Sequence, residues 1–143
     1  MLFRSDGPEL ENLQALSAQV YEDVVFVGGK FGAELEPYYK AADLFVLPGT
    51  GGLAVQQAMS YSLPVLVGEA DGTQAQLVRP ENGWLVERMS VDTLADALQQ
   101  ALQDAARLRQ MGLASYRIVA EEVNLERMVV GFVDAVNAVA SNR

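Results

Sequence analysis

The sequence contains no cysteine and no histidine. Without cysteine there is no disulfide framework, no thiolate nucleophile and no cysteine-ligated zinc site. Without histidine the chain has no Ser-His-Asp triad and no imidazole to act as a general acid or base. Any chemistry must therefore rest on carboxylates, lysine or arginine side chains, hydroxyls, backbone amides or a bound small molecule.

Positive charge and long apolar runs are also scarce. Ten Lys and Arg residues against nineteen Asp and Glu residues give a formal net charge of −9. Such a charge repels nucleic acid and anionic lipid. No apolar run approaches the ~20 residues of a membrane-spanning helix, and the N-terminus lacks the basic-then-apolar layout of a signal peptide. These absences predict a cytoplasmic protein that does not bind nucleic acid.

Apolar side chains, in contrast, are plentiful. Half of the 143 residues are hydrophobic, which excludes a disordered chain. A domain of this size buries about 68–70% of its unfolded surface. Because no repeat, low-complexity stretch or linker interrupts the sequence, it predicts a single domain over residues 1–143.

Short apolar strands alternate with helices along the first ninety residues. Strands that are apolar on both faces are typical of a covered parallel sheet, and their alternation with helices indicates βαβ units. The predicted fold class is α/β: a Rossmann-like, three-layer α/β/α arrangement with a parallel sheet. The predicted strands are Leu2–Phe3, Val24–Val27, Leu44–Leu47, Pro64–Val67 and Gly83–Val86. The predicted helices between them are 10–20, 34–42, 53–61 and 74–78.

The rest of the chain is predicted to be helical. Apolar residues recur at helical spacing from Leu94 onward, with Ser90 as the N-cap. A second helix is predicted over Ala105–Met111, ended by Gly112, and a terminal helix begins after Asn124. Nearer the start, Asp6 or Ser5 is predicted to cap the first helix, with Pro8 in its first turn.

Three glycine-containing loops follow predicted strands, at residues 28–32, 48–53 and 68–74. Ligands of open parallel sheets bind beyond the carboxyl ends of the strands. The second loop, Pro48-Gly49-Thr50-Gly51-Gly52-Leu53, leads into a helix, and free amides at a helix N-terminus suit phosphate. It matches neither a Walker A loop nor the GxGxxG fingerprint. Phosphate binding and a simple tight turn both remain open from the loop alone.

Five motifs occur in a familiar order. They are Ser5-Asp6-Gly7-Pro8-Glu9-Leu10, Val24-Val25-Phe26-Val27-Gly28, the stretch from Tyr38 to Pro48 (similar to Y-x-x-A-D-x-F-V-L-P), the stretch from Gln57 to Val65 (similar to E-A-M-A-x-G-x-P-V), and Asn82-Gly83-Trp84-Leu85-Val86. From about residue 5 to residue 136 the chain resembles the C-terminal, nucleotide-sugar-binding domain of the family 4 (group 1) glycosyltransferases, which have the GT-B fold.

The resemblance implies retaining transfer of a hexosyl group from a UDP-sugar or GDP-sugar to an acceptor, with no metal and no other cofactor. No catalytic residue is assigned. It also implies that Glu69, Asp71, Thr73 and Gln74 lie near the donor sugar, and that the final helix contacts a second domain. The residues that it places at the donor are Gly28, Lys30, Gly49, Thr50, Gly51, Gly52, Leu53 and Gln57.

The chain departs from the family pattern in two carboxylates. The family has two glutamates eight positions apart, and they fall on Gly49 and Gln57 here. Gln57 still offers hydrogen bonds to ribose hydroxyls, but without charge assistance. Gly49 has no side chain to contact the donor sugar. The sugar therefore stays unassigned.

The resemblance also implies that the leading strand and helix, which carry an arginine and a lysine, and the N-terminal acceptor domain are absent from these 143 residues. The chain is then a truncated C-terminal half of a GT-B enzyme that binds nucleotide weakly and transfers no sugar alone. Self-association through Leu2–Phe3 or the terminal helix is expected, as is a location in the cytoplasm or at the inner membrane face. A non-catalytic Rossmann-like interaction module and a GT-B-type nucleotide-sugar epimerase remain as alternatives.

Overall fold

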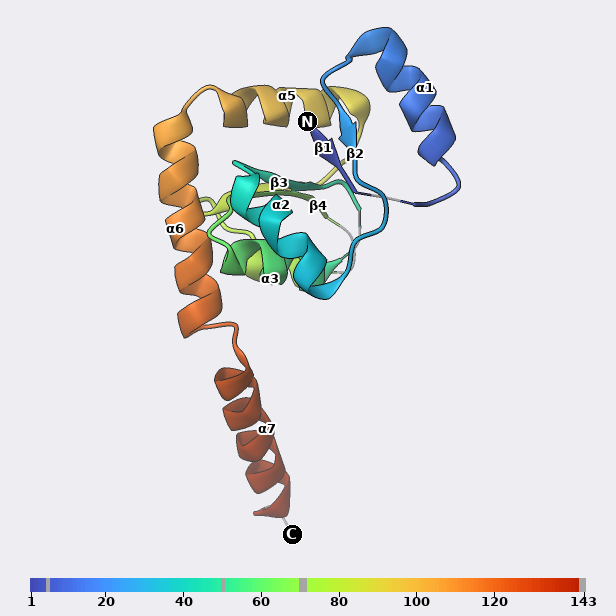
Figure 1. Ribbon diagram of the computed structural model, residues 1–143. Coiled ribbons are helices and arrows are strands. Elements are labelled where there is room, and N and C mark those ends of the chain that lie inside the picture. The colour runs from blue at the N-terminus through green and yellow to red at the C-terminus, as the bar shows by residue number, and fades with distance from the viewer. Residues whose placement is uncertain (5, 50, 70–71, 142–143) are drawn as a thin grey trace. The chain divides into compact units, whose positions relative to one another are not determined.

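The structure, a computed structural model, describes residues 1–4, 6–49, 51–69 and 72–141. Ser5, Thr50 and Asp71, to which the sequence analysis gave roles, lie outside these described residues. The chain divides into two compact units, Met1–Lys40 and Ala41–Arg143, which are considered separately (Figure 1). That residues 1–143 form a single domain stays a prediction.

The first unit contains a two-stranded parallel sheet. Strand β1 (Leu2–Phe3) pairs with β2 (Val25–Phe26), with Leu2 opposite Val25 and Phe3 opposite Phe26. The rings of Phe3 and Phe26 lie 5.6 Å apart. Helix α1 (Leu10–Val20) connects the strands. The predicted helix over 34–42 is a 3₁₀ turn, η1 (Gly32–Leu35), followed by α2 (Glu36–Ala41).

The start of α1 differs from the prediction. Its N-cap is Glu9, which makes no capping side-chain hydrogen bond. The Leu10 amide donates to the Gly7 carbonyl at 3.0 Å, so a turn separates Asp6 from the first free helical amides. The Asp6 carboxylate instead lies beside Gly29, so close that a Cβ on residue 29 would clash with it. The prediction of Asp6 as a cap, with Pro8 in the first turn, is therefore wrong, and the alternative cap, Ser5, falls outside the described residues.

The second unit is built on a three-stranded parallel sheet in the order β3-β4-β5. The strands are β3 (Phe45–Leu47), β4 (Val65–Gly68) and β5 (Gly83–Val86). In register, Val46 stands opposite Leu66, and Leu66 opposite Trp84. All four residues of the central strand β4 are buried. The parallel pairing of β3, β4 and β5 confirms the predicted parallel sheet. The burial of β4 agrees with the rule that parallel sheets are covered on both faces.

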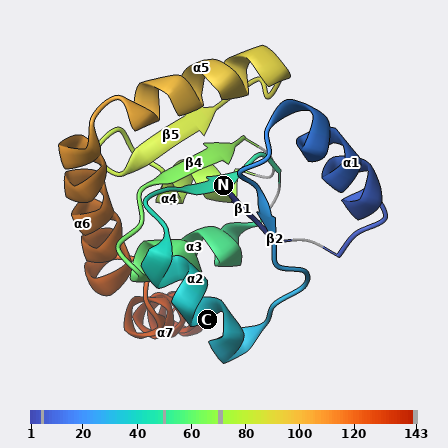
Figure 2. The ribbon, with the colours of Figure 1, turned by 45° about the horizontal axis from the view of Figure 1, so that its top comes forward.

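Helices cover this sheet (Figure 2). Helix α3 (Gly52–Ser60) packs against β3, β4 and the short α4 (Thr73–Leu77), and α5 (Val91–Leu102) packs against β5. Helix α6 (Ala105–Glu121) contacts both α3 and α5. The result is the predicted Rossmann-like α/β/α fold. Its most buried large side chains include Val55, Met59, Leu66 and Val67.

Side-chain caps define where the C-terminal helices begin. Ser90 and Thr93 form a capping box: the Thr93 amide donates to Ser90 Oγ at 3.1 Å and the Ser90 amide donates to Thr93 Oγ1 at 2.9 Å. Asn124 Oδ1 accepts a hydrogen bond from the Arg127 amide at 2.8 Å. Such caps are each worth about 1 kcal/mol. The predicted caps Ser90 and Asn124 are confirmed.

Gly112 does not end a helix, contrary to the prediction. Helix α6 continues through it to Glu121. Gly112 is buried, and a Cβ at this position would clash with the Ser62 carbonyl oxygen. The glycine therefore permits close approach of the α6 backbone to the backbone at Ser62. Glycine is common both at such close contacts and at helix ends, so the sequence alone does not distinguish the two.

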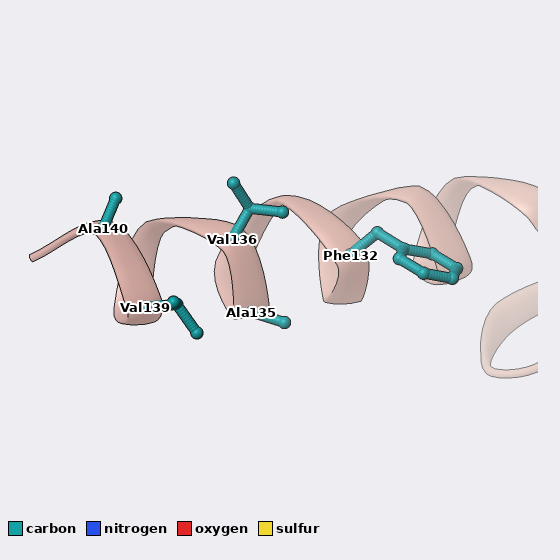
Figure 3. Close-up of a pocket in the computed structure, with 5 residues that line it drawn as sticks. All are labelled: Phe132, Ala135, Val136, Val139 and Ala140. Carbon is teal, nitrogen blue, oxygen red and sulfur yellow. The ribbon is translucent and has the colours of Figure 1, made fainter.

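The last helix, α7 (Leu125–Ala140), has no buried residue. Its apolar side chains are mostly exposed, and one run of them lines a shallow surface hollow (Figure 3). The hollow is lined by Phe132, Ala135, Val136, Val139 and Ala140. Across the part of the chain that the structure describes, no helix is both long and apolar enough to cross a membrane.

Candidate functional site

The loop between β3 and α3 leads into the first turn of α3 at the carboxyl edge of the sheet. Gly51 is the N-cap of α3, and this residue makes no side-chain capping hydrogen bond. Its carbonyl accepts the first helical hydrogen bond, from the Val55 amide at 3.3 Å. The amides of the first helical turn have no acceptor within the helix, and the helix dipole places partial positive charge there. This end of α3 is suited to bind an anion.

Two of the glycines at this helix end, Gly51 and Gly52, lie close to neighbouring side chains. Gly51 has a φ of +151°, and a Cβ there would lie 3.1 Å from Leu47 Cδ2. A Cβ on Gly52 would lie 3.1 Å from Thr73 Oγ1. Gly49 is exposed and has no atom within 4 Å of its Cβ position, and Leu53 is 82% exposed. The loop backbone is therefore packed against other side chains at Gly51 and Gly52, and it is exposed to solvent at Gly49 and Leu53.

The first turn of α4 lies against the first turn of α3. The contact between Thr73 and Gly52 marks this junction, and the two helices pack along each other. Gln74, the next residue of α4, is fully buried. Glu69, at the end of β4, is exposed and its amide donates to the Val86 carbonyl at 3.0 Å. Asp71 lies outside the described residues.

The predicted donor residues fall in both units. The second unit gathers Gly49, Gly51, Gly52 and Leu53 at the start of α3, with the half-buried Gln57 farther along the same helix. Gly28 and Lys30 belong to the first unit, in the loop after β2. Gly28 has a φ of +69°, and Lys30 Nζ lies 4.0 Å from Glu34 Oε1. Thr50 lies outside the described residues.

The sequence did not predict two features beside β5: a contact between Arg107 and Trp84, and a hollow in the surface. The Arg107 guanidinium lies 5.5 Å from the ring centre of the half-buried Trp84 and covers that ring. A hollow beside β5 is lined by residues 78–80 and 83–86, together with Ala97 and Arg107. Among the described residues no three Asp or Glu side chains converge as metal ligands would. Neither feature has a local sequence signal, because both depend on residues from different elements.

A bidentate ion pair joins the loop after α4 to the end of α6. Arg79 Nη2 lies 2.6 Å from Glu122 Oε2, and Arg79 Nη1 donates to Oε1 at 3.0 Å. Hydrogen bonding by Arg79 holds the pKa of Glu122 below its usual 4.5, and the same contact raises the pKa of Arg79. Both side chains are partly exposed, so solvent screens the pair.

The Glu122→Gln variant should show the pH dependence of this pair. A carboxylate with a lowered pKa stabilises the fold above its unfolded pKa, and this contribution is lost as pH falls through the folded pKa. The variant should therefore have a slightly lower melting temperature than the wild-type chain at pH 7. The difference should vanish once the pH has fallen below the folded-state pKa of Glu122. Thermal melts across this pH range measure the effect. A difference in melting temperature that grows on acidification would contradict it.

The sequence of the chain matches a known protein family. Residues 2–104 match the family described as "Glycosyl transferases group 1". The chain is 32% identical over 120 residues to a GDP-mannose-dependent alpha-(1-6)-phosphatidylinositol monomannoside mannosyltransferase of Mycobacterium tuberculosis, covering 76% of this chain and 31% of that protein. It is 30% identical over 138 residues to the corresponding monoacylated-substrate enzyme of Corynebacterium glutamicum, covering 90% and 36%. The chain thus spans about a third of the length of these curated relatives.

Solved structures share the fold. Sucrose-phosphate synthase from Thermosynechococcus elongatus superposes with a TM-score of 0.75 at 24% identity, over 99% of this chain and 38% of that one. The C-terminal domain of a glycosyl transferase group 1 family protein from Francisella tularensis gives 0.67 at 25% identity, over 83% and 66%. Anabaena HepE in complex with UDP gives 0.75 at 18% identity, over 96% and 40%. The chain belongs to the group 1 glycosyltransferases and has the Rossmann-like architecture of a GT-B domain.

Proposed function

We propose that this chain is the donor-binding domain of a glycosyltransferase and binds a nucleoside-diphosphate sugar at the N-terminal end of α3. The observation that carries the proposal is the first turn of α3, whose N-cap is Gly51 and whose first residue is Gly52, so that the N-cap itself offers no side-chain cap. Relatives are named as GDP-mannose-dependent, and HepE structures hold UDP and UDP-glucose, which supports a nucleotide-sugar donor of one of these two kinds.

In this proposal the backbone does most of the binding. Amides at Gly52 and Leu53, with Thr50 from the preceding loop, bind the diphosphate. The helix dipole adds roughly 0.3–1 kcal/mol, or ~2 kcal/mol when partly buried. Gln57 donates to or accepts from the ribose hydroxyls. That Gly28 and Lys30 of the first unit contact a phosphate or the edge of the base stays a prediction from the sequence.

The proposed reaction is retaining transfer, without a metal or another cofactor. Departure of the nucleoside diphosphate develops negative charge, and preorganised donors at that position lower the barrier. The amides of α3 supply part of this stabilisation. We propose that a second domain supplies the remaining positive charge and positions the acceptor, so that the chain alone has no measurable transfer.

A specific observation favours a second candidate, a nucleotide-binding module without turnover. Gly49 and Gln57 occupy the two positions where the family pattern has glutamate. A module that binds nucleotide and performs no transfer can dispense with both carboxylates. Transfer or donor hydrolysis when the chain is combined with an acceptor domain would separate the transferase from this alternative.

Nucleotide binding at α3 should appear in a ¹⁵N spectrum of the chain. Adding UDP or GDP is expected to shift the amide signals of Gly52, Leu53 and Ala54, since these amides face the phosphates. The Gly51→Val variant should lose the response, because valine disfavours the positive φ and would crowd Leu47.

The matched control for this prediction is Gly131→Val. Gly131 lies in α7, where its Cβ position has no neighbour within 4 Å, so the nucleotide response should persist. Retained dispersion of the spectrum shows that each variant is folded. Shifts confined to surface residues far from α3, at millimolar nucleotide, would contradict the proposed site.

A further inference from the structure

Strand β5 lies at the edge of the sheet in the second unit. In the order β3-β4-β5 it pairs with β4 alone, within the part of the chain that the structure describes. The Val65 amide donates to the Asn82 carbonyl at 3.1 Å, and the Glu69 amide donates to the Val86 carbonyl at 3.0 Å. Alternate residues of a strand bond to the same parallel neighbour, so the amide and carbonyl of Leu85 point away from β4. Among the described residues, neither group has another backbone partner.

A hollow of about 380 Å³ lies beside this strand. Its lining is formed by β5, by the turn that precedes β5, by Ala97 of α5 and by Arg107 of α6. Sites that take small molecules usually have volumes of ~300–1,000 Å³, so this hollow can hold side chains of a bound segment. None of the described residues that line it is acidic.

Arg107 is the arginine of this hollow that has no carboxylate partner among the described residues. Its guanidinium lies 5.5 Å from the ring centre of Trp84. The carboxylate of Asp104 caps α6 instead, where its Oδ1 accepts from the Arg107 amide at 2.9 Å. The other arginine of the hollow, Arg79, is paired with Glu122. In a chain with a net charge of −9, an unpaired guanidinium beside a hollow favours a carboxylate from outside the chain.

These groups together select an extended peptide with acidic side chains. A peptide main chain carries both donors and acceptors, so it can bond to both groups of Leu85 as an added strand. A guanidinium that covers an aromatic ring still presents N–H groups at its edge, and these bind a carboxylate through two parallel hydrogen bonds. A small carboxylate would satisfy the guanidinium but would leave the Leu85 carbonyl without a donor.

We propose that the outer edge of β5 and the hollow beside it form a docking site for an extended, acidic segment of a partner protein. The segment pairs with Leu85 through its main chain and places a carboxylate on Arg107. No residue from the start of α3 lines the hollow. The docking site is therefore independent of the proposed nucleotide binding.

The test uses Trp84, which is the single tryptophan of the sequence and lines the hollow, so its fluorescence reports directly on the site. The probe is a short capped peptide of alternating glutamate and valine, titrated into the full chain. Arg107→Gln is compared with Arg109→Gln, because both arginines are exposed on α6 but Arg109 does not line the hollow. Two further peptides carry lysine in place of glutamate, or methyl groups on every backbone amide.

We expect the acidic peptide to change the fluorescence of Trp84 in a saturable manner. Arg107→Gln should bind it about tenfold more weakly, because charge-assisted hydrogen bonds are lost, whereas Arg109→Gln should bind it as the wild-type chain does. The lysine peptide should not bind, because it brings a like charge to Arg107. The methylated peptide should bind about tenfold more weakly than its parent, since it cannot donate to the Leu85 carbonyl.

Four results would overturn the proposal. Equal affinities of the wild-type chain and Arg107→Gln would exclude the guanidinium from the site. A methylated peptide that binds as tightly as its parent would exclude strand addition. The same fluorescence change with succinate at the same concentrations would assign the hollow to small carboxylates. No saturable change in fluorescence, together with no heat of binding in titration calorimetry, would show that the edge of β5 does not bind such a segment.

Discussion

The Gly112→Ala variant should melt about 10 °C below the wild-type chain, which corresponds to ~3 kcal/mol of lost stability. An added Cβ at Gly112 would clash with the carbonyl oxygen of Ser62, and would lie 3.4 Å from Pro64 Cδ. The clash involves backbone, which cannot rotate away as a flexible side chain would. Either α6 or the corner between α3 and β4 must move, and both pack on the core of the second unit. Thermal denaturation measures the loss.

Gly131→Ala is the matched control for this prediction. Gly131 also lies inside a helix, α7, but no atom is within 4 Å of its Cβ position. Alanine there gains up to ~1 kcal/mol of helix propensity without a steric cost. The melting temperature of Gly131→Ala should therefore stay the same or rise. Equal melting temperatures for Gly112→Ala and the wild type would show that α6 and the Ser62 corner are not in close contact in solution.

The second large effect concerns assembly: we expect the chain to self-associate through α7. Leu125, Val129, Phe132, Val136 and Val139 recur at alternating spacings of four and three residues. This spacing is typical of helices that pair along an apolar seam. All five are more than half exposed, and an isolated helix of 16 residues is marginal in water. Light scattering at high protein concentration should give a mass above the 15.5 kDa of one chain.

Variants can locate the contact. Replacing Phe132 and Val136 with aspartate should reduce the mass to that of one chain, because a charge on the seam would be buried by pairing. Leu113→Asp, on an exposed position of α6, is the control and should leave the mass unchanged. Leu2→Asp tests the other expected surface, the strand Leu2–Phe3, where Leu2 is 46% exposed. A wild-type chain that is strictly monomeric at high concentration would contradict both surfaces.

Local patterns predicted most of the elements. Strand Gly83–Val86 has the predicted bounds, since a glycine starts a short apolar run of the kind a covered sheet requires. Ser90 and Asn124 were identifiable as caps because capping depends on residues within one helical turn. The order of apolar strands and helices was sufficient for the α/β class, which the sheet of the second unit confirms.

Contacts between residues far apart in the sequence explain what local patterns missed. Gly112 resembled a helix end because its reason for being glycine, the Ser62 carbonyl, is remote in the sequence. Asp6 resembled a cap, but the turn formed by Gly7 and Leu10 moved the helix start beyond its reach. The glycines of the α3 loop left phosphate binding and a simple tight turn open, and the phosphate site stays a prediction. The burial of Gln74 depends on how α4 packs on α3, which no spacing rule encodes.

Ser62 has a φ of +59°, and it stands where the family pattern has glycine. A side chain in the left-handed region costs roughly 1–2 kcal/mol, a sizeable part of the ~5–15 kcal/mol that holds a typical domain folded. A side chain at Gly112, on the facing helix, would clash with the same corner. Sequence change is therefore restricted at two positions: position 62 favours residues that tolerate this backbone, and a side chain at position 112 destabilises the fold. A chain that already bears this cost has less capacity to absorb destabilising mutations elsewhere in the second unit.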